Sequence, residues 1–301
     1  MGQGPIKLTA IVGPTAVGKT ALAVAMAARV GGEIVSADSR QVYRQMDIGT
    51  AKPTAAERAA APHHLIDIVD PDEEFSLATY QELALAAIDD IAARGRVPLL
   101  VGGTGQYLAA LLEGWQIPRV PPQPELRAAL EREAAERGAE ALHARLAAVD
   151  PVAAARIPPA NLRRVIRALE VHAVTGRPIS DQQTRVPPPF AVRTIWLTRP
   201  RDELYARADA RVDAMVAAGL ADEVAGLLRR GYGWELPAMS SLGYAQLRPY
   251  LEGAASLADC VERLKFDTHA FIRRQGAWFR RLPGLEVWTP DHPEWRALAE
   301  G

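Results

Sequence analysis

Residues 13–20 read Gly13-Pro14-Thr15-Ala16-Val17-Gly18-Lys19-Thr20. This stretch matches G-x-x-x-x-G-K-[ST] in full, and it lies between an apolar strand pattern at 8–12 and a helical pattern at 20–29. Glycines in such a loop let backbone N–H groups close around phosphate oxygens, and the helix N-terminus adds a partial positive charge. The lysine neutralises phosphate charge, and the threonine hydroxyl binds Mg²⁺. We therefore predict a diphosphate or triphosphate site formed by Gly13, Thr15, Ala16, Val17, Gly18, Lys19 and Thr20, with Thr20 as the metal ligand.

The patterns on either side of this loop predict the fold class. Apolar strand patterns at 8–12, 33–36, 65–69, 97–101 and 193–197 alternate with helical patterns, as in a parallel sheet that is covered on both faces. Helical patterns fill most of 125–176 and 201–282, and a short strand pattern follows at 285–288. We predict an α/β fold, in which a P-loop NTPase-like parallel sheet core carries a helical insertion domain and a mostly helical C-terminal part. The expected domain boundaries are 1–115, 116–190 and 191–301.

Composition excludes several classes of protein. The 301 residues are 49% hydrophobic and 24% charged, which is typical of a globular chain and excludes a mostly disordered one. The net charge of −1 excludes a uniformly basic nucleic-acid binder but leaves room for local basic patches. Cys260 is the only cysteine, so the chain has neither an intrachain disulfide nor a cysteine-rich zinc site. No apolar run reaches about 18 residues, and we expect a cytoplasmic monomer without a membrane segment.

Asp38 follows the second predicted strand. In an open α/β sheet, ligands bind beyond the carboxyl ends of the strands, so Asp38 is expected near the phosphate loop. A carboxylate there could accept a proton from an attacking nucleophile, although it could also cap the following turn. Asp67 and Asp70, near the end of the third predicted strand, are weaker candidates for Mg²⁺ ligands, and Asp67 is better explained as a residue that orders a loop.

Several longer stretches then carry a resemblance to a known family. They are SADSRQVYRQMDIGTAKPT at 36–54, PHHLIDIVDP at 62–71, VGGTGQYL at 101–108, DPVAAARI at 150–157, RALEVHAVTGRP at 167–178, GY at 243–244 and RRQGAWFRR at 273–281. Together with the phosphate loop, and in this order over nearly the whole chain, they resemble the bacterial tRNA dimethylallyltransferases, also called tRNA isopentenyltransferases.

The resemblance implies a reaction and a set of residues. The family transfers a dimethylallyl group from dimethylallyl diphosphate to the N6 amine of the adenosine at tRNA nucleotide position 37, just 3′ of the anticodon. By this resemblance the loop would hold a diphosphate with Mg²⁺ on Thr20, and Asp38 would accept the amine proton. An arginine that contacts the diphosphate falls at Arg207, with Arg211 one turn away as the second choice. The channel for the flipped base would be lined by Asp38, Ser39, Arg40, Gln41 and Thr104.

Two basic windows are candidate RNA contacts. Arg156, Arg163, Arg164 and Arg167 fall in a window without Asp or Glu, and the family contacts tRNA through the stretch that matches 163–167. A second window at 263–281 predicts a helix with one cationic face, formed by Lys265, His269, Arg273 and Arg280. Phosphate contacts of this kind supply affinity and register. The predicted tRNA contacts from the two windows are Arg163, Arg164, Arg167, Arg273 and Arg274.

Three other functions stay open at this level. Free adenosine phosphates are an alternative prenyl acceptor, although the two arginine windows favour RNA. A P-loop small-molecule kinase would also place an acid such as Asp38 beside its phosphate loop. An RNA-binding module with a vestigial loop is the third, and intact Lys19, Thr20 and Asp38 argue against it.

Overall fold

The computed structural model describes residues 5–186, 188–282 and 284–299. The chain divides into two compact units, of which the first comprises Met1–Leu112 and Pro189–Gly301 and the second Glu113–Pro188. Each unit has a hydrophobic core of its own. Among the described residues, no helix is long and apolar enough to cross a lipid bilayer.

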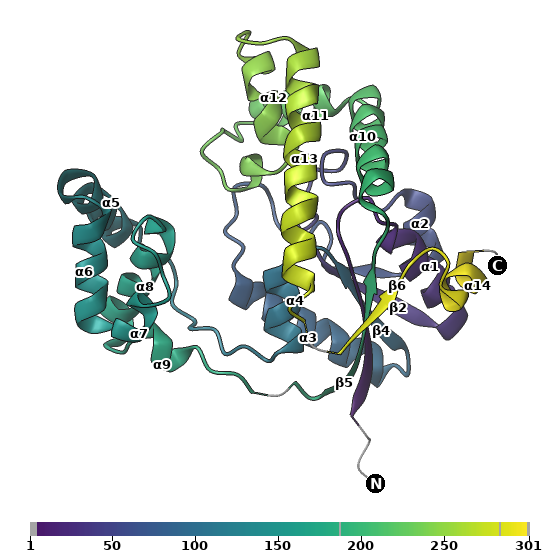
Figure 1. The fold of residues 1–301 in the computed structure, drawn as a ribbon, viewed down its shortest axis with the longest axis horizontal. Helices are drawn as coiled ribbons and strands as arrows, with labels where there is room; N and C mark the ends of the chain where they lie inside the picture. Colours follow the sequence, from purple (N-terminus) through teal and green to yellow (C-terminus); the bar gives the residue numbers. More distant parts are fainter. Residues whose placement is uncertain (1–4, 187, 283, 300–301) are drawn as a thin grey trace. The chain divides into compact units, whose positions relative to one another are not determined.

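The first unit is built on a six-stranded sheet in the order β3-β2-β4-β1-β5-β6 (Figure 1). All the strand pairs are parallel, so all carboxyl ends lie at one edge. In the centre of the sheet, Ile11 of β1 pairs with Val101 of β4 and Ile195 of β5. The strands are β1 (Ile6–Val12), β2 (Gly32–Ala37), β3 (His63–His64), β4 (Val97–Gly102), β5 (Phe190–Leu197) and β6 (Leu285–Trp288).

Helices cover both faces of this sheet. Alternate side chains of β1 enter two different cores, because successive residues of a strand point to opposite faces. Ile11 packs with Leu22 and Leu204 on one side, whereas Leu8 packs with Tyr80 on the other. The first core is covered by α1 (Lys19–Val30), α10 (Arg201–Ala217) and α14 (Pro293–Ala299), and the second by α3 (Leu77–Ala93) and α4 (Gly105–Leu112). The α/β class predicted from the sequence is thereby confirmed.

A third core joins the C-terminal helices to the segment that follows β2. Val42, Tyr43 and Met46 from this segment pack with buried residues of α11 (Leu220–Arg229), η1 (Ala238–Ser240), α12 (Tyr244–Leu251) and α13 (Leu257–Phe279). The long helix α13 packs along α10 and α12 (Figure 1). Its last turns reach the sheet, where Phe279 is fully buried with Tyr80 and Tyr107 in the second core. The short helix α2 (Ala55–Ala60) lies in the connection between β2 and β3.

Within its described residues, the second unit has helices as its only regular elements. Leu142, Leu146, Val165 and Val171 are fully buried in its core. The chain enters and leaves through paired extended segments, because Val186 N donates to Gly114 O at 2.8 Å. The helices are α5 (Pro124–Arg137), α6 (Ala139–Val149), α7 (Pro151–Ala154), α8 (Leu162–Thr175) and α9 (Ile179–Gln182).

The third predicted strand, at 65–69, is wrong. The strand β3 comprises only His63–His64, and the backbone then turns because Leu65 and Asp67 have φ values of 63° and 59°. Left-handed conformations of this kind interrupt a β ladder. Ile68 N instead donates to Val42 O at 2.8 Å, so the apolar residues of this stretch hold the segment after β2 rather than extend the sheet.

Candidate active site

The phosphate loop between β1 and α1 turns its carbonyl groups toward cationic side chains. Lys19 Nζ donates to Gly13 O and Pro14 O, both at 2.9 Å. Arg207 Nε donates to Ala16 O at 3.0 Å and Arg199 Nε to Val17 O at 2.9 Å. Because the carbonyls are bound in this way, the N–H groups of Ala16, Val17 and Gly18 are left to face an anion, whereas Thr15 N donates to Gln275 Oε1 at 2.9 Å.

The loop adopts a backbone conformation that few residues tolerate. Gly18 has a φ of 111°, and a Cβ on Gly13 would lie 2.7 Å from Leu197 O. Ala16 has a φ of 63°, which strains a residue with a side chain and is common at ligand sites. Within the described residues, no protein acceptor binds the N–H groups of Ala16, Val17 or Gly18. The loop therefore has the form of an anion cradle.

Besides Lys19, Arg199 and Arg207, which bind the loop, Arg211 adds a positive charge near Lys19. Burial lowers the pKa of Lys19 to about 8; the charge of Asp38 opposes this shift and that of Arg211 adds to it. The pKa of Arg211 is also lowered, first by partial desolvation in the surrounding protein and then by the charge of Arg207. The residue nevertheless keeps contact with solvent. Clustered like charges of this kind disfavour one another until an anion neutralises them. The arrangement of Lys19, Arg207 and Arg211 suits a ligand with several negative charges.

Asp38 stands at the carboxyl end of β2, close enough to Lys19 for their charges to interact. Its Oδ1 accepts a hydrogen bond from Arg40 N at 2.9 Å, which fixes the turn after the strand. The next residue is tied to the loop after β4, because Ser39 N donates to Thr104 Oγ1 at 3.0 Å. Thr104 N donates to Ala37 O at 3.1 Å. The structure thus brings Asp38, Ser39 and Thr104 together beside the phosphate loop.

Two aromatic rings stand near Asp38. Tyr80 and Tyr107 are stacked, with ring centroids 3.7 Å apart and an interplanar angle of 14°. Burial raises the pKa of both phenols, and the charge of Asp38 contributes to the shift in each. Tyr80 is fully buried, and its hydroxyl has no hydrogen-bond partner among the described residues. These rings provide an apolar wall next to the carboxylate.

The other predicted channel residues hold the segment after β2. The Gln41 amide is occupied, since Oε1 accepts from Ser36 Oγ at 3.2 Å and Nε2 donates to Ala51 O at 3.1 Å. Arg40 reaches the turn at η1, where Nη1 donates to Pro237 O at 2.8 Å. Gln41 could therefore contact a base only if its hydrogen bonds with Ser36 and Ala51 were broken.

Asp67 orders this segment. Its carboxylate binds Lys52 Nζ at 2.5 Å and Arg58 Nη1 at 2.8 Å. Burial by itself would raise the pKa of Asp67, but these two cations outweigh it and hold the pKa below its usual value. Asp70 pairs with Arg44 at 3.2 Å. Both carboxylates are engaged by protein cations, which supports the interpretation of Asp67 as a loop-ordering residue.

Glu223 on α11 anchors the same segment from the other side. Its carboxylate accepts hydrogen bonds from Asp47 N, Ile48 N and Gly49 N at 2.9, 2.8 and 3.1 Å. The Tyr244 hydroxyl donates to it at 2.6 Å. A Cβ on Gly49 would lie 2.4 Å from the Tyr244 ring, so a glycine is required there. One carboxylate therefore joins the sequence stretches at 47–49 and 243–244.

A divalent metal at the phosphate loop would have few protein ligands. Among the residues that the structure describes, no group of three or more His, Cys, Asp and Glu side chains could hold a metal. Mg²⁺ in phosphate-transfer sites characteristically keeps several waters and takes few protein ligands, completing its shell with substrate oxygens. Thr20 stands in the first turn of α1, where its hydroxyl could serve as such a ligand.

Three of the four side chains on the predicted cationic face of α13 are engaged by α10. Lys265 Nζ pairs with Asp213 at 2.8 Å, and His269 Nε2 with Asp209 at 2.8 Å. Arg273 Nη1 donates to the Tyr205 hydroxyl at 3.1 Å. These partners all belong to α10, so much of this face joins two helices rather than facing solvent alone. Arg274 is exposed, with its guanidinium 5.8 Å from the centroid of the Phe271 ring.

The arginines of α8 differ in their environments. Arg163 and Arg164 are exposed in the first turn of the helix. Arg167 instead binds Glu170 Oε2 at 2.6 Å and Val120 O at 3.0 Å. Glu170 is completely buried, so the interaction with Arg167 helps to compensate a buried charge.

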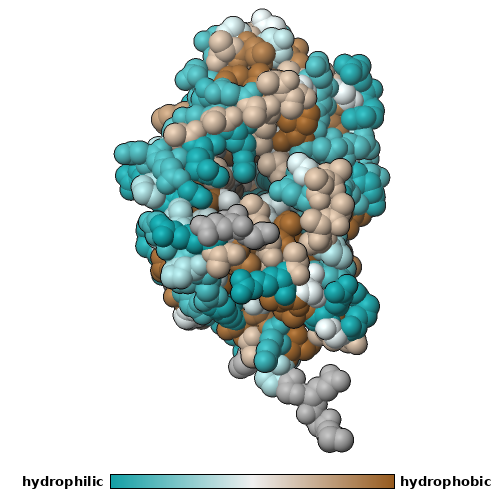
Figure 2. Space-filling model, turned by 90° about the vertical axis from the view of Figure 1, so that its right-hand side faces the viewer, coloured by the Kyte–Doolittle hydropathy of each residue, from teal (hydrophilic) through white to brown (hydrophobic). Residues whose placement is uncertain are grey.

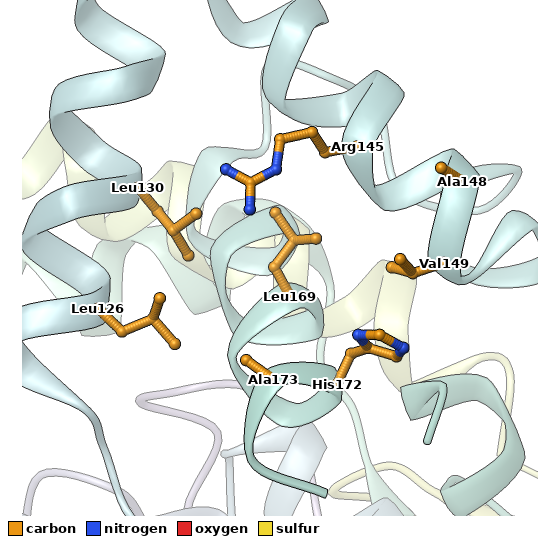
Figure 3. A pocket seen from close by; sticks show the side chains of 8 residues that line it. All are labelled: Leu126, Leu130, Arg145, Ala148, Val149, Leu169, His172 and Ala173. Atoms are coloured by element: carbon orange, nitrogen blue, oxygen red, sulfur yellow. The ribbon is translucent and has the colours of Figure 1, made fainter. Parts of the chain in front are cut away.

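A groove of about 250 Å³ lies among α5, α6 and α8 in the helical unit (Figure 3). It is mostly apolar, with Leu126, Leu130 and Leu169 on its walls and Arg145 reaching between them. Arg145 is paired with Glu133. None of the predicted site residues lines this groove. On the face of the molecule drawn in Figure 2, hydrophilic residues surround a hollow near the middle.

Sequence reasoning missed three residues that shape the site. Arg199 and Glu223 lie in no conspicuous motif, and their partners are 182 and 174–176 positions away. Gln275 lies within the recognised stretch at 273–281, but its contacts with Thr15 and Gly103 span 260 and 172 positions. The motif at 273–281 is the only sequence signal that could have identified Gln275, and the motif does not predict which residues Gln275 contacts.

The parallel sheet, its phosphate loop and the adjacent carboxylate define a P-loop α/β enzyme. Comparison with family models identifies it more closely, since the IPP transferase model matches residues 41–282 and the isopentenyl transferase model matches residues 6–67. The chain belongs to the IPP transferase family, and it is a transferase.

Close relatives and solved structures agree with this assignment. The chain is 75% identical to the tRNA dimethylallyltransferase of Chloroflexus aggregans over 97% of its length and 99% of the relative's. A tRNA isopentenylpyrophosphate transferase from Bacillus halodurans matches with 43% identity and a TM-score of 0.72, covering 98% of this chain and 93% of that one. A eukaryotic dimethylallyltransferase described as acting on tRNA matches with 29% identity and a TM-score of 0.83, covering 98% and 78%.

Proposed function

We propose that this enzyme transfers a dimethylallyl group from dimethylallyl diphosphate to the N6 amine of an adenosine in tRNA. The expected acceptor is the adenosine at tRNA nucleotide position 37 in the anticodon loop, and the products are N6-(dimethylallyl)adenosine and diphosphate. The observation that carries the proposal is the juxtaposition of Asp38 with a phosphate loop whose carbonyls are held by Lys19, Arg199 and Arg207. A carboxylate and an anion cradle side by side suit the two halves of this reaction.

In the proposed reaction, the adenosine N6 forms a bond to the allylic carbon while the bond from that carbon to the diphosphate oxygen breaks. Asp38 takes the proton that N6 loses, because an exocyclic adenine amine is a weak nucleophile. Lys19 and Arg207 stabilise the charge that develops on the leaving diphosphate. Thr20 would hold Mg²⁺, which would supply further positive charge at the leaving group. The stacked rings of Tyr80 and Tyr107 keep the neighbourhood of the carboxylate apolar.

For the tRNA contacts, we propose Arg163 and Arg164 from α8 and Arg274 from α13, because these guanidinium groups are exposed. Arg167 and Arg273 are already engaged by Glu170 and Tyr205, and we assign them a role in holding their helices. Ser39, Arg40, Gln41 and Thr104 would line the approach of the flipped base to Asp38. The expected location is the cytoplasm, where tRNA is modified.

Nucleoside mass spectrometry tests the proposal directly. The purified enzyme is incubated with unmodified tRNA, Mg²⁺ and dimethylallyl diphosphate in the absence of ATP, and the tRNA is then digested. N6-(dimethylallyl)adenosine is expected in the digest, and a Lys19→Met enzyme serves as the control for a contaminating activity.

The alternatives predict different outcomes in parallel reactions. Modification of free adenosine phosphate with tRNA left unmodified would indicate the smaller acceptor. ATP turnover stimulated by a metabolite would indicate a kinase. Binding of tRNA with no product from either acceptor would indicate an RNA-binding module.

A further inference from the structure

Gln275 on α13 makes one hydrogen bond to each of two loops at the carboxyl edge of the sheet. Its Oε1 accepts from Thr15 N at 2.9 Å, and its Nε2 donates to Gly103 O at 2.9 Å. The residue is only 7% exposed. The amide therefore connects the phosphate loop after β1 with the loop after β4, and both of its polar atoms are used.

The loop after β4 is shaped to receive α13. A Cβ on Gly103 would lie 2.5 Å from Gln275 Nε2, and a Cβ on Gly105 would lie 2.4 Å from the Trp278 ring. Real Cβ atoms essentially never approach other atoms this closely. Gly103 and Gly105 thus give room for Gln275 and Trp278, whereas Gly102 gives room for Ala37 of β2.

The same loop continues to the carboxylate side of the site. Thr104 Oγ1 accepts from Ser39 N at 3.0 Å, and Asp38 is the preceding residue. The strands concerned are neighbours in the order β2-β4-β1. A series of hydrogen bonds and short backbone steps therefore runs from Thr15, through Gln275, Gly103 and Thr104, to Ser39 beside Asp38.

We propose that Gln275 is a positioning residue that holds the phosphate loop at a fixed place relative to the loop that supports Asp38. By accepting from Thr15 N, it also withdraws that N–H group from the phosphate cradle and leaves the following N–H groups to bind diphosphate. The catalytic importance of this positioning rests on the proposed function. Its effect on the phosphate loop, however, is measurable without tRNA or prenyl transfer.

An amide is required because the site needs one acceptor and one donor on the same planar group. Gln275→Met keeps nearly the same length and volume but removes both hydrogen bonds. Gln275→Glu keeps an acceptor for Thr15 N, but it can donate to Gly103 O only when the carboxyl group is protonated.

The first measurement is the affinity of the full-length enzyme for magnesium diphosphate by calorimetry. Gln275→Met is expected to bind it about tenfold more weakly than wild type, since the cradle loses its fixed geometry. Gln246→Met is the matched control, because Gln246 also accepts one backbone N–H, from Gly243 at 2.9 Å, and donates once, to Asp267 at 2.9 Å. The control is expected to bind diphosphate as wild type does.

The pH dependence of Gln275→Glu separates positioning from packing. Its affinity relative to wild type is expected to rise as the pH falls, because protonation restores the donor to Gly103 O and removes the negative charge. In the transfer assay, Gln275→Met should lower kcat and leave the KM for tRNA within about twofold. Wild-type diphosphate affinity in Gln275→Met, or a pH-independent ratio for Gln275→Glu, would overturn the proposal. Failure of the wild-type enzyme to modify tRNA would instead refute the proposed function and leave the diphosphate comparison valid.

Discussion

At the scale of single residues, Asp38 carries the proton transfer in the proposed reaction. Asp38→Asn keeps an oxygen that can accept from Arg40 N, a bond that measures 2.9 Å in the native chain. We therefore expect the fold and the diphosphate affinity to persist while single-turnover transfer slows by roughly a hundredfold to ten-thousandfold, as for a lost general base. Quenched-flow measurement of modified tRNA checks this. An enzyme that retains full activity would remove the assigned role of Asp38.

Lys19 makes the diphosphate site sensitive to alkaline pH. Its pKa is lowered to about 8, so the free enzyme loses this positive charge well below the usual range for lysine. Bound diphosphate favours the protonated form, and its affinity is therefore expected to fall as the pH rises above about 8. Calorimetric titrations across this range test the expectation. In Lys19→Arg the guanidinium stays charged, so any remaining affinity should vary less with pH; equal slopes would contradict the assignment.

At the scale of elements, α11 stabilises the segment after β2 through Glu223. Glu223→Ala leaves the N–H groups of Asp47, Ile48 and Gly49 without their acceptor, and we expect a loss of about 2–4 kcal/mol in the free energy of unfolding. Tyr244→Phe removes one bond to the same carboxylate and should cost about 1 kcal/mol. Urea denaturation compares the two. Similar small losses in both variants would show that Glu223 does not anchor the segment.

The helix α8 carries two exposed arginines, Arg163 and Arg164, and one arginine, Arg167, that binds a buried carboxylate. The double substitution Arg163→Ala and Arg164→Ala is expected to weaken tRNA binding. It should also reduce the slope of log affinity against log salt concentration by about 1–2. Arg167→Ala should mainly destabilise the helical unit, because Glu170 is buried and would lose a partner. Binding titrations at several salt concentrations and thermal unfolding distinguish the effects. A salt slope unchanged in the double variant would exclude these two residues as phosphate contacts.

At the scale of the whole molecule, the helical unit is an insertion whose two ends are paired. Gln116 N donates to Thr184 O at 2.8 Å and Val186 N to Gly114 O at 2.8 Å. Replacing residues 117–183 by Asn-Gly, which favours a tight hairpin turn, should leave the first unit folded with its diphosphate affinity. The tRNA affinity is expected to drop about tenfold or more. Loss of diphosphate binding or of cooperative unfolding would show that the two units depend on each other.

Much of the first unit could be predicted from local sequence patterns. The stretch at 13–20 located the phosphate loop, and the apolar runs at 97–101 and 285–288 correspond to β4 and β6. These features depend on residues that are close in sequence, so periodicity and glycine placement are sufficient to predict them. The strand predicted at 65–69 failed because left-handed conformations at Leu65 and Asp67 break an apolar run that otherwise looks extended.

The sequence alone determined the fold class, the phosphate loop and, through its motifs, the family and the place of Asp38. Only the tertiary structure showed that Gln275 joins two loops, that Glu223 anchors a third, and that Lys265 and His269 face α10 rather than standing free. The reason is physical. A helical pattern defines which residues share a face, but the charge that meets that face comes from residues 52–60 positions away, and only folding brings it there.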